Sequence, residues 1–298
     1  MRIVKDRVIF PFLKKMLPGR SRKVRGNKLR VTFDRLISDL RGLGISDGDH
    51  VLTHASLSRI GYVPDGPRTV IEAILATVGP NGTALFPALS SDPEISPEQP
   101  PVFDVRISRT QGIGVIPESA RGYPGAARSL QPTHSVTAIG GLAQWFVEGH
   151  ERCETPCGAG SPYDKLGQVD GKILLLGCDH QANTTMHLVE EMIGVPYHLL
   201  PGVAIATVTG ADGYRHHLPV RLHRWGVPRD FMRTDAEMSR RGIQRVGLVG
   251  LAESRLVDAR AMCEFLFTRL REDPYLLLPV DYHLPREFDY ALHGRSVL

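Results

Sequence analysis

From Leu29 onward, the chain alternates between short apolar runs and longer stretches in which apolar residues recur every three or four positions. The first pattern predicts buried strands, and the second predicts helices packed on them. We expect strands at 50–54, 83–86, 135–139, 172–177 and 245–251, and helices at 29–43, 69–78, 141–150, 230–241 and 257–271. This alternation is typical of a three-layer α/β/α sandwich with a mixed, mostly parallel sheet.

Two stretches depart from the alternation. Residues 88–110 contain four prolines and little periodicity, which predicts a long surface loop. Loops of this length inside a compact domain are often functional. Residues 153–162 are rich in glycine and proline and predict a turn, and less regular β segments are expected after Pro201.

The most informative stretch begins with the apolar run 172–177, which is typical of a buried parallel strand. Open α/β sheets bind ligands beyond the carboxyl ends of such strands. If Asn183 or Thr184 caps the next helix, His187 lies in its first turn, where the helix dipole helps to keep the imidazole neutral. Glu190 and Glu191 follow on the same helical face, and either could hold the ring in one tautomer.

A neutral histidine oriented by a carboxylate suits acyl transfer to an amine, because the acceptor nitrogen must lose a proton before or during attack. The alternative is that His187 forms hydrogen bonds only within its helix while both glutamates face solvent. The position beyond a buried strand favours neither interpretation strongly over the other.

Length and composition limit the remaining choices. With 298 residues and 42% hydrophobic content, the chain can form one large α/β domain or two small ones. It contains no apolar run long enough for a spanning helix and no secretory leader pattern, so we expect a cytoplasmic protein. Four cysteines in a chain of this length do not form a disulfide framework, and we expect reduced thiols.

The first thirty residues hold eleven Lys and Arg against Asp6 alone. We therefore expect a basic N-terminal extension over 1–28 and a single domain over 29–298. The apolar stretch 8–13 within the extension could contact an anionic membrane surface or a partner protein, and a plain solvated extension or a domain-edge helix is the alternative. Nucleic-acid binding is not expected, because no aromatic–basic motif or zinc-finger spacing accompanies the charge.

Several short motifs follow one another along the chain. They are Thr53-His54-Ala55-Ser56-Leu57 with Ile60-Gly61, Val78-Gly79-Pro80-Asn81-Gly82-Thr83, Gly112-Ile113-Gly114-Val115-Ile116-Pro117-Glu118 with Arg121, Pro124-Gly125-Ala126-Ala127-Arg128-Ser129, Pro132-Thr133-His134-Ser135-Val136 with Ala138-Ile139-Gly140, Gly160-Ser161-Pro162 with Leu166, Leu174-Leu175-Leu176-Gly177, and Asn183-Thr184-Thr185-Met186-His187 with Glu190. In this order they resemble the aminoglycoside 3-N-acetyltransferase family, which uses acetyl-CoA and is distinct from the GNAT acetyltransferases. The resemblance extends from about residue 30 to residue 200 and is looser beyond.

The resemblance implies an acetyltransferase-like domain in which His187 is the catalytic base and Glu190 the carboxylate that accompanies it. It also implies that the loop with His54, Ser56 and Leu57 lies near the thioester and the pantetheine arm of acetyl-CoA. Backbone N–H groups of the last two residues could then stabilise the developing oxyanion.

A second segment with Arg128, Ser129 and Ser135 resembles the CoA-contacting region of the family, in which the arginine could bind a phosphate. An ordinary ion pair is the alternative for Arg128. One position departs from the family pattern, because Gln131 stands where relatives usually have histidine. Glutamine keeps hydrogen bonding but cannot become charged near neutral pH, which leaves the substrate range more open than the reaction type.

The expected acceptor is an amine of an aminoglycoside, an amino sugar or a related small molecule, and a homodimer is the assembly that we consider. No metal is expected. The alternatives are a module that binds CoA or zinc without N-acetyltransferase activity, and a transferase that uses another acyl donor.

Two alternatives concern the cysteines. Zinc could be held by Cys153 and Cys157, or by Cys178 with His180 and His187 near the end of the strand, although the spacing is loose. Thiol catalysis by Cys178 or Cys157 would instead form a covalent acyl-enzyme, whereas cysteines without chemistry are the simpler interpretation.

Overall fold

The computed structural model describes residues 29–285. The basic extension 1–28, with the membrane or partner contact expected of it, lies outside the described residues. No helix within the described range is long and apolar enough to cross a membrane.

The core of the fold is a seven-stranded sheet with the order β4-β5-β2-β1-β6-β10-β9. In this order, the strands span Ala127–Arg128, Val136–Gly140, Thr83–Pro87, His50–Ala55, Lys172–Leu176, Ala252–Asp258 and Gln244–Val249. Only the β1–β2 and β1–β6 pairs are parallel, and the other pairs are antiparallel. Because β5 and β10 alone run against the rest, most strands share one direction, but most neighbouring strands pair antiparallel.

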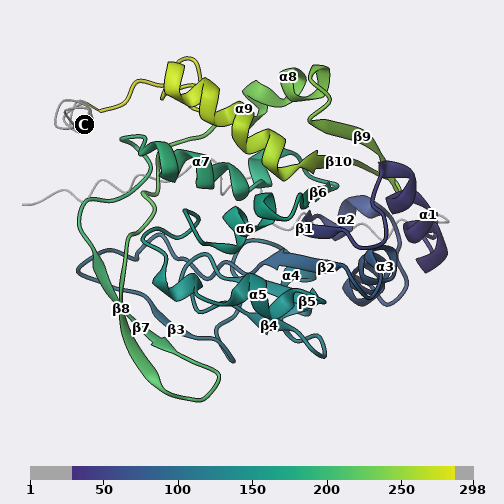
Figure 1. Cartoon of the computed structure of the whole chain (residues 1–298), viewed down its shortest axis with the longest axis horizontal. Coiled ribbons are helices and arrows are strands. Elements are labelled where there is room, and N and C mark those ends of the chain that lie inside the picture. The colour runs from purple at the N-terminus through teal and green to yellow at the C-terminus, as the bar shows by residue number, and fades with distance from the viewer. Residues whose placement is uncertain (1–28, 286–298) are drawn as a thin grey trace, which may run out of the picture.

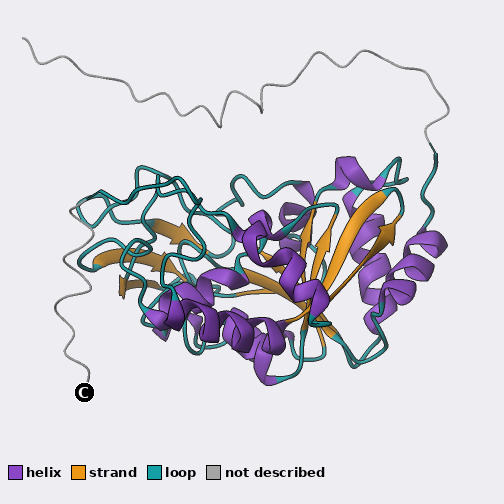
Figure 2. Ribbon diagram, turned by 90° about the horizontal axis from the view of Figure 1, so that it is seen from above, coloured by secondary structure: helices purple, strands orange, loops and turns teal. Residues whose placement is uncertain are grey.

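Helices cover both faces of this sheet, as Figure 2 shows. Side chains alternate along the strands, so that Val51 and Leu174 point to one face while Leu52 and Ile173 point to the other. The first face packs against α1 (Phe33–Leu43), α3 (Pro67–Val78) and α4 (Val115–Arg121), and the second against α5 (Ala143–Val147), α6 (Pro162–Gln168), α7 (Thr185–Ile193), α8 (Asp235–Arg240) and α9 (Ala259–Glu272). The expected three-layer α/β/α sandwich is therefore confirmed.

A second, three-stranded sheet lies apart from the larger one, at the lower left of Figure 1. It consists of β3 (Val102–Asp104), β7 (Ala204–Thr209) and β8 (Arg215–Val220), and Phe103 fills the centre of its small core. The prediction of one long loop over 88–110 is thus wrong at β3. That strand is only three residues long, and its partner β7 follows about a hundred residues later, so no local pattern reveals it.

The ends of several helices differ from the prediction for local reasons. The helix α1 begins after Thr32, whose side chain accepts a hydrogen bond from the Arg35 N–H group. The predicted helix 257–271 begins only after Asp258, because Val257 still belongs to β10, a strand that the sequence analysis missed. The predicted helix 141–150 corresponds to α5, followed by the 3-10 helix η2 (His150–Arg152). The predicted helix 230–241 corresponds to the 3-10 helix η4 (Phe231–Thr234), followed by α8.

Candidate active site

The parallel strands β1 and β6 end side by side at Ala55 and Leu176, so the loops that follow them meet at one edge of the sheet. A cavity of about 960 Å³ lies there. Its wall is formed mainly by residues 54–58, 112–115 and 181–184, together with His187 and Phe231. The cavity is therefore at the strand ends, where the sequence analysis expected a ligand site, and its volume suits a large organic ligand.

His187 reaches this cavity from the first turn of α7. The Asn183 Oδ1 atom accepts a hydrogen bond from the Thr185 N–H group at 3.2 Å, which helps to start the helix where the sequence predicted. Another short helix, η3 (His180–Ala182), connects β6 to this turn. The imidazole of His187 is 23% exposed.

Glu190 is the carboxylate that holds the His187 ring. Its Oε2 atom lies 2.7 Å from Nδ1 of His187, and its Oε1 atom accepts a hydrogen bond from Nε of Arg229 at 2.8 Å. The Glu190 side chain is fully buried. Burial alone would raise its pKa, but the Arg229 charge and the His187 hydrogen bond outweigh burial and hold the pKa below its ordinary value. Glu190 is therefore ionised at neutral pH and orients the imidazole.

Glu191, the other glutamate that the sequence offered to His187, contacts different partners. Its Oε1 atom lies 2.5 Å from Nε2 of His223, and its Oε2 atom accepts a hydrogen bond from the Cys157 N–H group at 2.9 Å. Burial, the largest influence, raises the pKa of Glu191 to about 7. The two adjacent glutamates thus support two different histidines.

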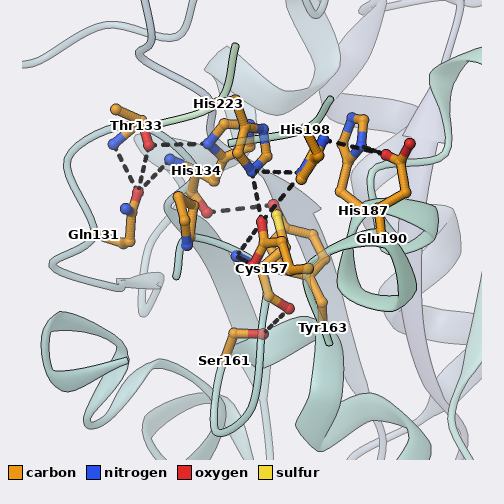
Figure 3. Close-up of polar contacts among 12 residues, drawn as sticks. Gln131, Thr133, His134, Cys157, Ser161, Tyr163, His187, Glu190, His198 and His223 are labelled. Atoms are coloured by element: carbon orange, nitrogen blue, oxygen red, sulfur yellow. Dashed lines mark hydrogen bonds and ion pairs between the residues drawn. The ribbon is translucent and has the colours of Figure 1, made fainter. Parts of the chain in front are cut away.

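Four imidazole rings gather around these glutamates, as Figure 3 shows. The ring of His187 stacks on His198 with 4.8 Å between centroids, and His223 lies 4.1 Å from His198 and 4.0 Å from His134. Burial lowers the pKa of His134, His198 and His223 well below the ordinary value. The rings around His187 are therefore neutral at pH 7.

The predicted cofactor residues His54, Ser56 and Leu57 all line the cavity. Burial, with smaller contributions from the charges of His180 and His187, lowers the pKa of His54 to about 3. The Ser56 N–H group donates to the Leu176 carbonyl at 2.9 Å, so it is not free to bind a thioester oxygen as the sequence analysis suggested. Leu57 begins the short helix α2 (Leu57–Ile60), where backbone N–H groups have no partner within the helix.

The structure places Arg128, Ser129 and Ser135 outside the cavity wall. The Arg128 guanidinium donates to the Ser135 hydroxyl at 3.0 Å and to the carbonyls of Ala88 and Ser108, and it stacks over Phe103. The Ser135 hydroxyl donates to the Ala88 carbonyl, and the Ser129 hydroxyl accepts from the Val136 N–H group. Arg128 and Ser135 thus fasten the edge of the larger sheet to residues 88–110, the segment that carries β3.

Gln131 has a local role. Its Oε1 atom accepts hydrogen bonds from the N–H groups of Thr133 and His134 and from the Thr133 hydroxyl. The position thus requires an acceptor rather than a charge. A neutral imidazole also offers one acceptor nitrogen, so the departure from the family pattern keeps this function.

The cysteines show few features of reactive thiols. Burial raises the pKa of Cys178 to about 12 and that of Cys157 well above the ordinary value. Within residues 29–285, three groups of side chains are close enough to share an ion. Cys157 and His187 each belong to one of these groups, whereas Cys153, Cys178 and His180 belong to none. Among the described residues, neither zinc set that the sequence suggested therefore belongs to a group of three or more side chains close enough to share an ion.

The sequence analysis did not identify Arg229, His198 and His223 as site residues. The chain contains 36 Lys and Arg residues, and no local pattern distinguishes Arg229 from the others. All three follow α7 and the last of the motifs in the chain, and they reach the site only through tertiary packing. Their proximity to Glu190 and Glu191 could not be read from spacing.

A carboxylate-held imidazole lies beside a large cavity at the strand ends of an α/β sandwich, which is where enzymes of this fold class bind organic ligands. Residues 52–271 match the model of the aminoglycoside 3-N-acetyltransferase family, and the chain belongs to this family. The resemblance inferred from the motifs and the expectation of an acyltransferase are both confirmed.

Relatives of known sequence cover most of the chain. Aminoglycoside N(3)-acetyltransferase VIII of Streptomyces fradiae is 32% identical over 259 residues, which are 79% of this chain and 90% of that protein. Aminoglycoside N(3)-acetyltransferase IV of Salmonella sp is 31% identical and covers 82% of this chain and 88% of its own length.

Solved structures agree with this assignment. AAC-IIIb in a binary complex with CoASH has a TM-score of 0.69 and 33% identity, covering 82% of this chain and 97% of that one. A mutant of the aminoglycoside acetyltransferase AAC(3)-IVa in complex with apramycin has a TM-score of 0.68 and 28% identity, covering 84% and 96%. Acetyl-CoA as co-substrate agrees with the family and with the first of these structures, and none of these comparisons indicates a metal.

Proposed function

We propose that this protein transfers the acetyl group of acetyl-CoA directly to an amine of an aminoglycoside, with His187 as the general base. The observation that carries the proposal is the hydrogen bond between His187 Nδ1 and the buried, ionised Glu190. An ionised carboxylate accepts but does not donate, so Nδ1 carries the proton and Nε2 keeps a lone pair. A cavity-lining imidazole in this tautomer is ready to take a proton from a ligand.

The proposed transfer uses this lone pair. The acceptor first loses one proton to solvent, because it is mostly an ammonium ion at neutral pH. Its nitrogen then attacks the thioester carbonyl while His187 Nε2 takes the second proton. As the new N–C bond forms and the C–S bond breaks, the imidazolium returns this proton to the CoA sulfur. The products are the N-acetylated acceptor and CoASH, and Glu190 stabilises the transient imidazolium.

We propose that acetyl-CoA occupies the cavity beside His187, as the family relationship and the cavity volume support. His54, Ser56 and Leu57 form part of the wall, and the Leu57 N–H group is the candidate donor to the developing oxyanion. Arg59 follows this wall segment, its side chain is exposed, and its charge acts on the nearby cavity residue Cys178. It has no ion-pair partner within residues 29–285, and we assign it to a phosphate of CoA.

The acceptor follows from relatives rather than from a bound ligand. AAC(3)-IVa and AAC-VIa have been solved with apramycin and with sisomicin, respectively. We therefore propose an aminoglycoside as the first acceptor class to test, with amino sugars and related amines as further candidates. The thiol-release assay described below, run with other acyl-CoA thioesters, tests whether the protein uses another acyl donor.

The decisive experiment measures thiol release from acetyl-CoA with a panel of amines that includes 2-deoxystreptamine antibiotics. The variant His187→Ala should retain CoA binding by calorimetry but lose about 10²- to 10⁴-fold in kcat, which is typical for removal of a general base. His216→Ala, an exposed histidine on β8, is the matched control and should behave as the wild type. A loss of less than about tenfold in a folded, CoA-binding His187→Ala protein would refute the general-base role.

A further inference from the structure

The Glu190 carboxylate has two hydrogen-bond partners from different parts of the chain, His187 and Arg229, and His198 Nδ1 also lies 3.3 Å from its Oε2 atom. Its Oε2 atom faces His187, which is three positions earlier on the same helix, and its Oε1 atom faces Arg229 in the loop before η4. Both carboxylate oxygens are fully buried with the side chain. Because water does not reach this carboxylate, its protonation and its direction depend on His187, Arg229 and His198.

The Arg229 guanidinium is held rigidly. It stacks over the Tyr197 ring with 4.7 Å to the centroid, and its NH1 group donates to the Val227 carbonyl at 2.7 Å. Its NH2 group lies 2.9 Å from Nδ1 of His198. Because guanidinium only donates, His198 Nδ1 must accept, and that ring cannot compete with His187 as a donor to Glu190 from this atom.

The tautomer of His187 depends on the charge of Glu190. An ionised Glu190 accepts a proton from Nδ1 and leaves Nε2 with a lone pair. A protonated Glu190 could instead donate its O–H group to Nδ1, in which case Nε2 would carry the hydrogen and could not act as a base. Burial favours the protonated acid, and Arg229 is the cation that opposes burial.

We propose that Arg229 is a positioning residue of the transfer reaction, which keeps Glu190 ionised and thereby fixes His187 in the tautomer whose Nε2 is bare. This inference rests on the proposed general-base role of His187. Arg229 itself does not line the cavity, so it acts through Glu190 and not through substrate contact. It also keeps His198 from replacing His187 as the donor to Glu190.

The test compares Arg229→Gln and Arg229→Lys with the wild type. Arg229→Gln removes the charge and should lower kcat by about 10- to 100-fold, the range seen when groups that orient an active-site histidine are removed. The acid limb of its pH–rate profile should move to higher pH, because Glu190 then takes up a proton more easily. Arg229→Lys keeps the positive charge but lacks the planar guanidinium with its several donors, so its kcat should lie between those of the wild type and Arg229→Gln. The KM for acetyl-CoA should change by less than about threefold, since the cavity wall is unaltered.

Arg233→Gln is the matched control. This arginine lies four residues later and donates to the Leu278 carbonyl at 2.9 Å, away from Glu190. It should change stability without moving the pH profile. An equal shift in both arginine variants would indicate a structural effect and would overturn the proposal.

The tautomer can be observed without any assay of activity. Nitrogen-15 NMR of the His187 ring should show a protonated Nδ1 and a bare Nε2 in the wild type, and the reverse, or a mixture, in Arg229→Gln. A folded Arg229→Gln protein with the wild-type tautomer and pH profile would refute the role of Arg229. If His187→Ala instead keeps full activity, the general-base proposal itself fails, and the two outcomes are therefore distinguishable.

Discussion

Glu190 and Glu191 are adjacent in the sequence, but their carboxylates support different histidines. Glu190 Oε2 lies 2.7 Å from His187 Nδ1, whereas Glu191 Oε1 lies 2.5 Å from His223 Nε2. The first carboxylate has a lowered pKa and the second a raised one, because Arg229 contacts only the first. Identical side chains thus have different charges at the same pH.

The two glutamates should respond differently to the same substitution. In Glu190→Gln the amide oxygen turns to Arg229, and the amide N–H group then faces His187 Nδ1 and imposes the wrong tautomer. We expect kcat to fall by about 10²- to 10⁴-fold. Glu191→Gln should reduce kcat by less than about tenfold, because Glu191 does not contact His187. Thiol-release kinetics of the two variants measure this difference in kcat. An equal fall in kcat in both variants would show that the hydrogen bond between Glu190 and His187 is not required for activity.

Glu191 should also affect stability in a pH-dependent way. Its pKa is about 7 in the folded protein, above its ordinary value, so the folded state binds more protons than the unfolded state between about pH 4.5 and pH 7. Its contribution to stability is therefore present at low pH and is lost as the pH rises through this window. The buried histidines act in the opposite direction, since the unfolded state binds their protons below about pH 6.5.

The Glu191→Gln variant separates these effects. The difference in free energy of unfolding between the wild type and the variant should fall by about 1 to 3 kcal/mol from pH 5 to pH 7. Urea denaturation at several pH values measures this difference. A difference that is constant with pH would mean that Glu191 titrates in the folded protein at its ordinary pKa.

Cys178 lines the cavity, and we predict that it does not act as a nucleophile. Its Sγ atom donates to the His54 carbonyl at 3.4 Å, and its pKa of about 12 leaves almost no thiolate at neutral pH. We expect Cys178→Ala to keep kcat within about twofold of the wild type. Mass spectrometry after mixing with acetyl-CoA alone should show no acetylated protein, and an adduct that disappears in the variant would support thiol catalysis instead.

Arg128 should be important for stability rather than for the co-substrate. Its half-buried guanidinium makes three hydrogen bonds, to Ser135, Ala88 and Ser108. Arg128→Ala should destabilise the fold by about 2 to 4 kcal/mol while changing the KM for acetyl-CoA by less than about threefold. Arg106→Ala, at an exposed ion pair with Asp104, is the control and should leave the stability nearly unchanged. A large rise in the KM for acetyl-CoA without loss of stability in Arg128→Ala would instead support the contact with CoA that the motif suggested.

Arg59 offers a test of how the protein holds CoA. We expect Arg59→Ala to raise the KM for acetyl-CoA by about 3- to 30-fold, with Arg59→Lys in between, because a charge-assisted hydrogen bond to a phosphate is lost. S-acetylpantetheine lacks the nucleotide phosphates and should be used equally well by all three proteins. Dephospho-CoA binding identifies which phosphate is involved. Arg68→Ala, at an exposed pair with Glu72, is the control.

Local sequence determined the layered fold and the helix that carries His187. The stretch 172–176 forms an interior strand of the sheet. Because both faces of this strand are buried, its residues are almost all apolar and do not alternate between apolar and polar. The Asn183 side chain accepts a hydrogen bond from the Thr185 N–H group where α7 begins, and the helical spacing then places Glu190 beside His187. Each of these features depends on neighbours within a few residues, so a single sequence suffices to predict them.

Only the tertiary structure decided which glutamate forms the hydrogen bond with His187 and which cation keeps that glutamate ionised. Helical spacing allows both Glu190 and Glu191, and the choice is made by Arg229 and His223, which lie more than thirty residues away in the chain. The segment 88–110 likewise acquires a strand only through its pairing with β7. The physical reason is the same in both cases: electrostatic and hydrogen-bond partners of buried groups are set by packing across the chain, which leaves no periodic trace in the sequence.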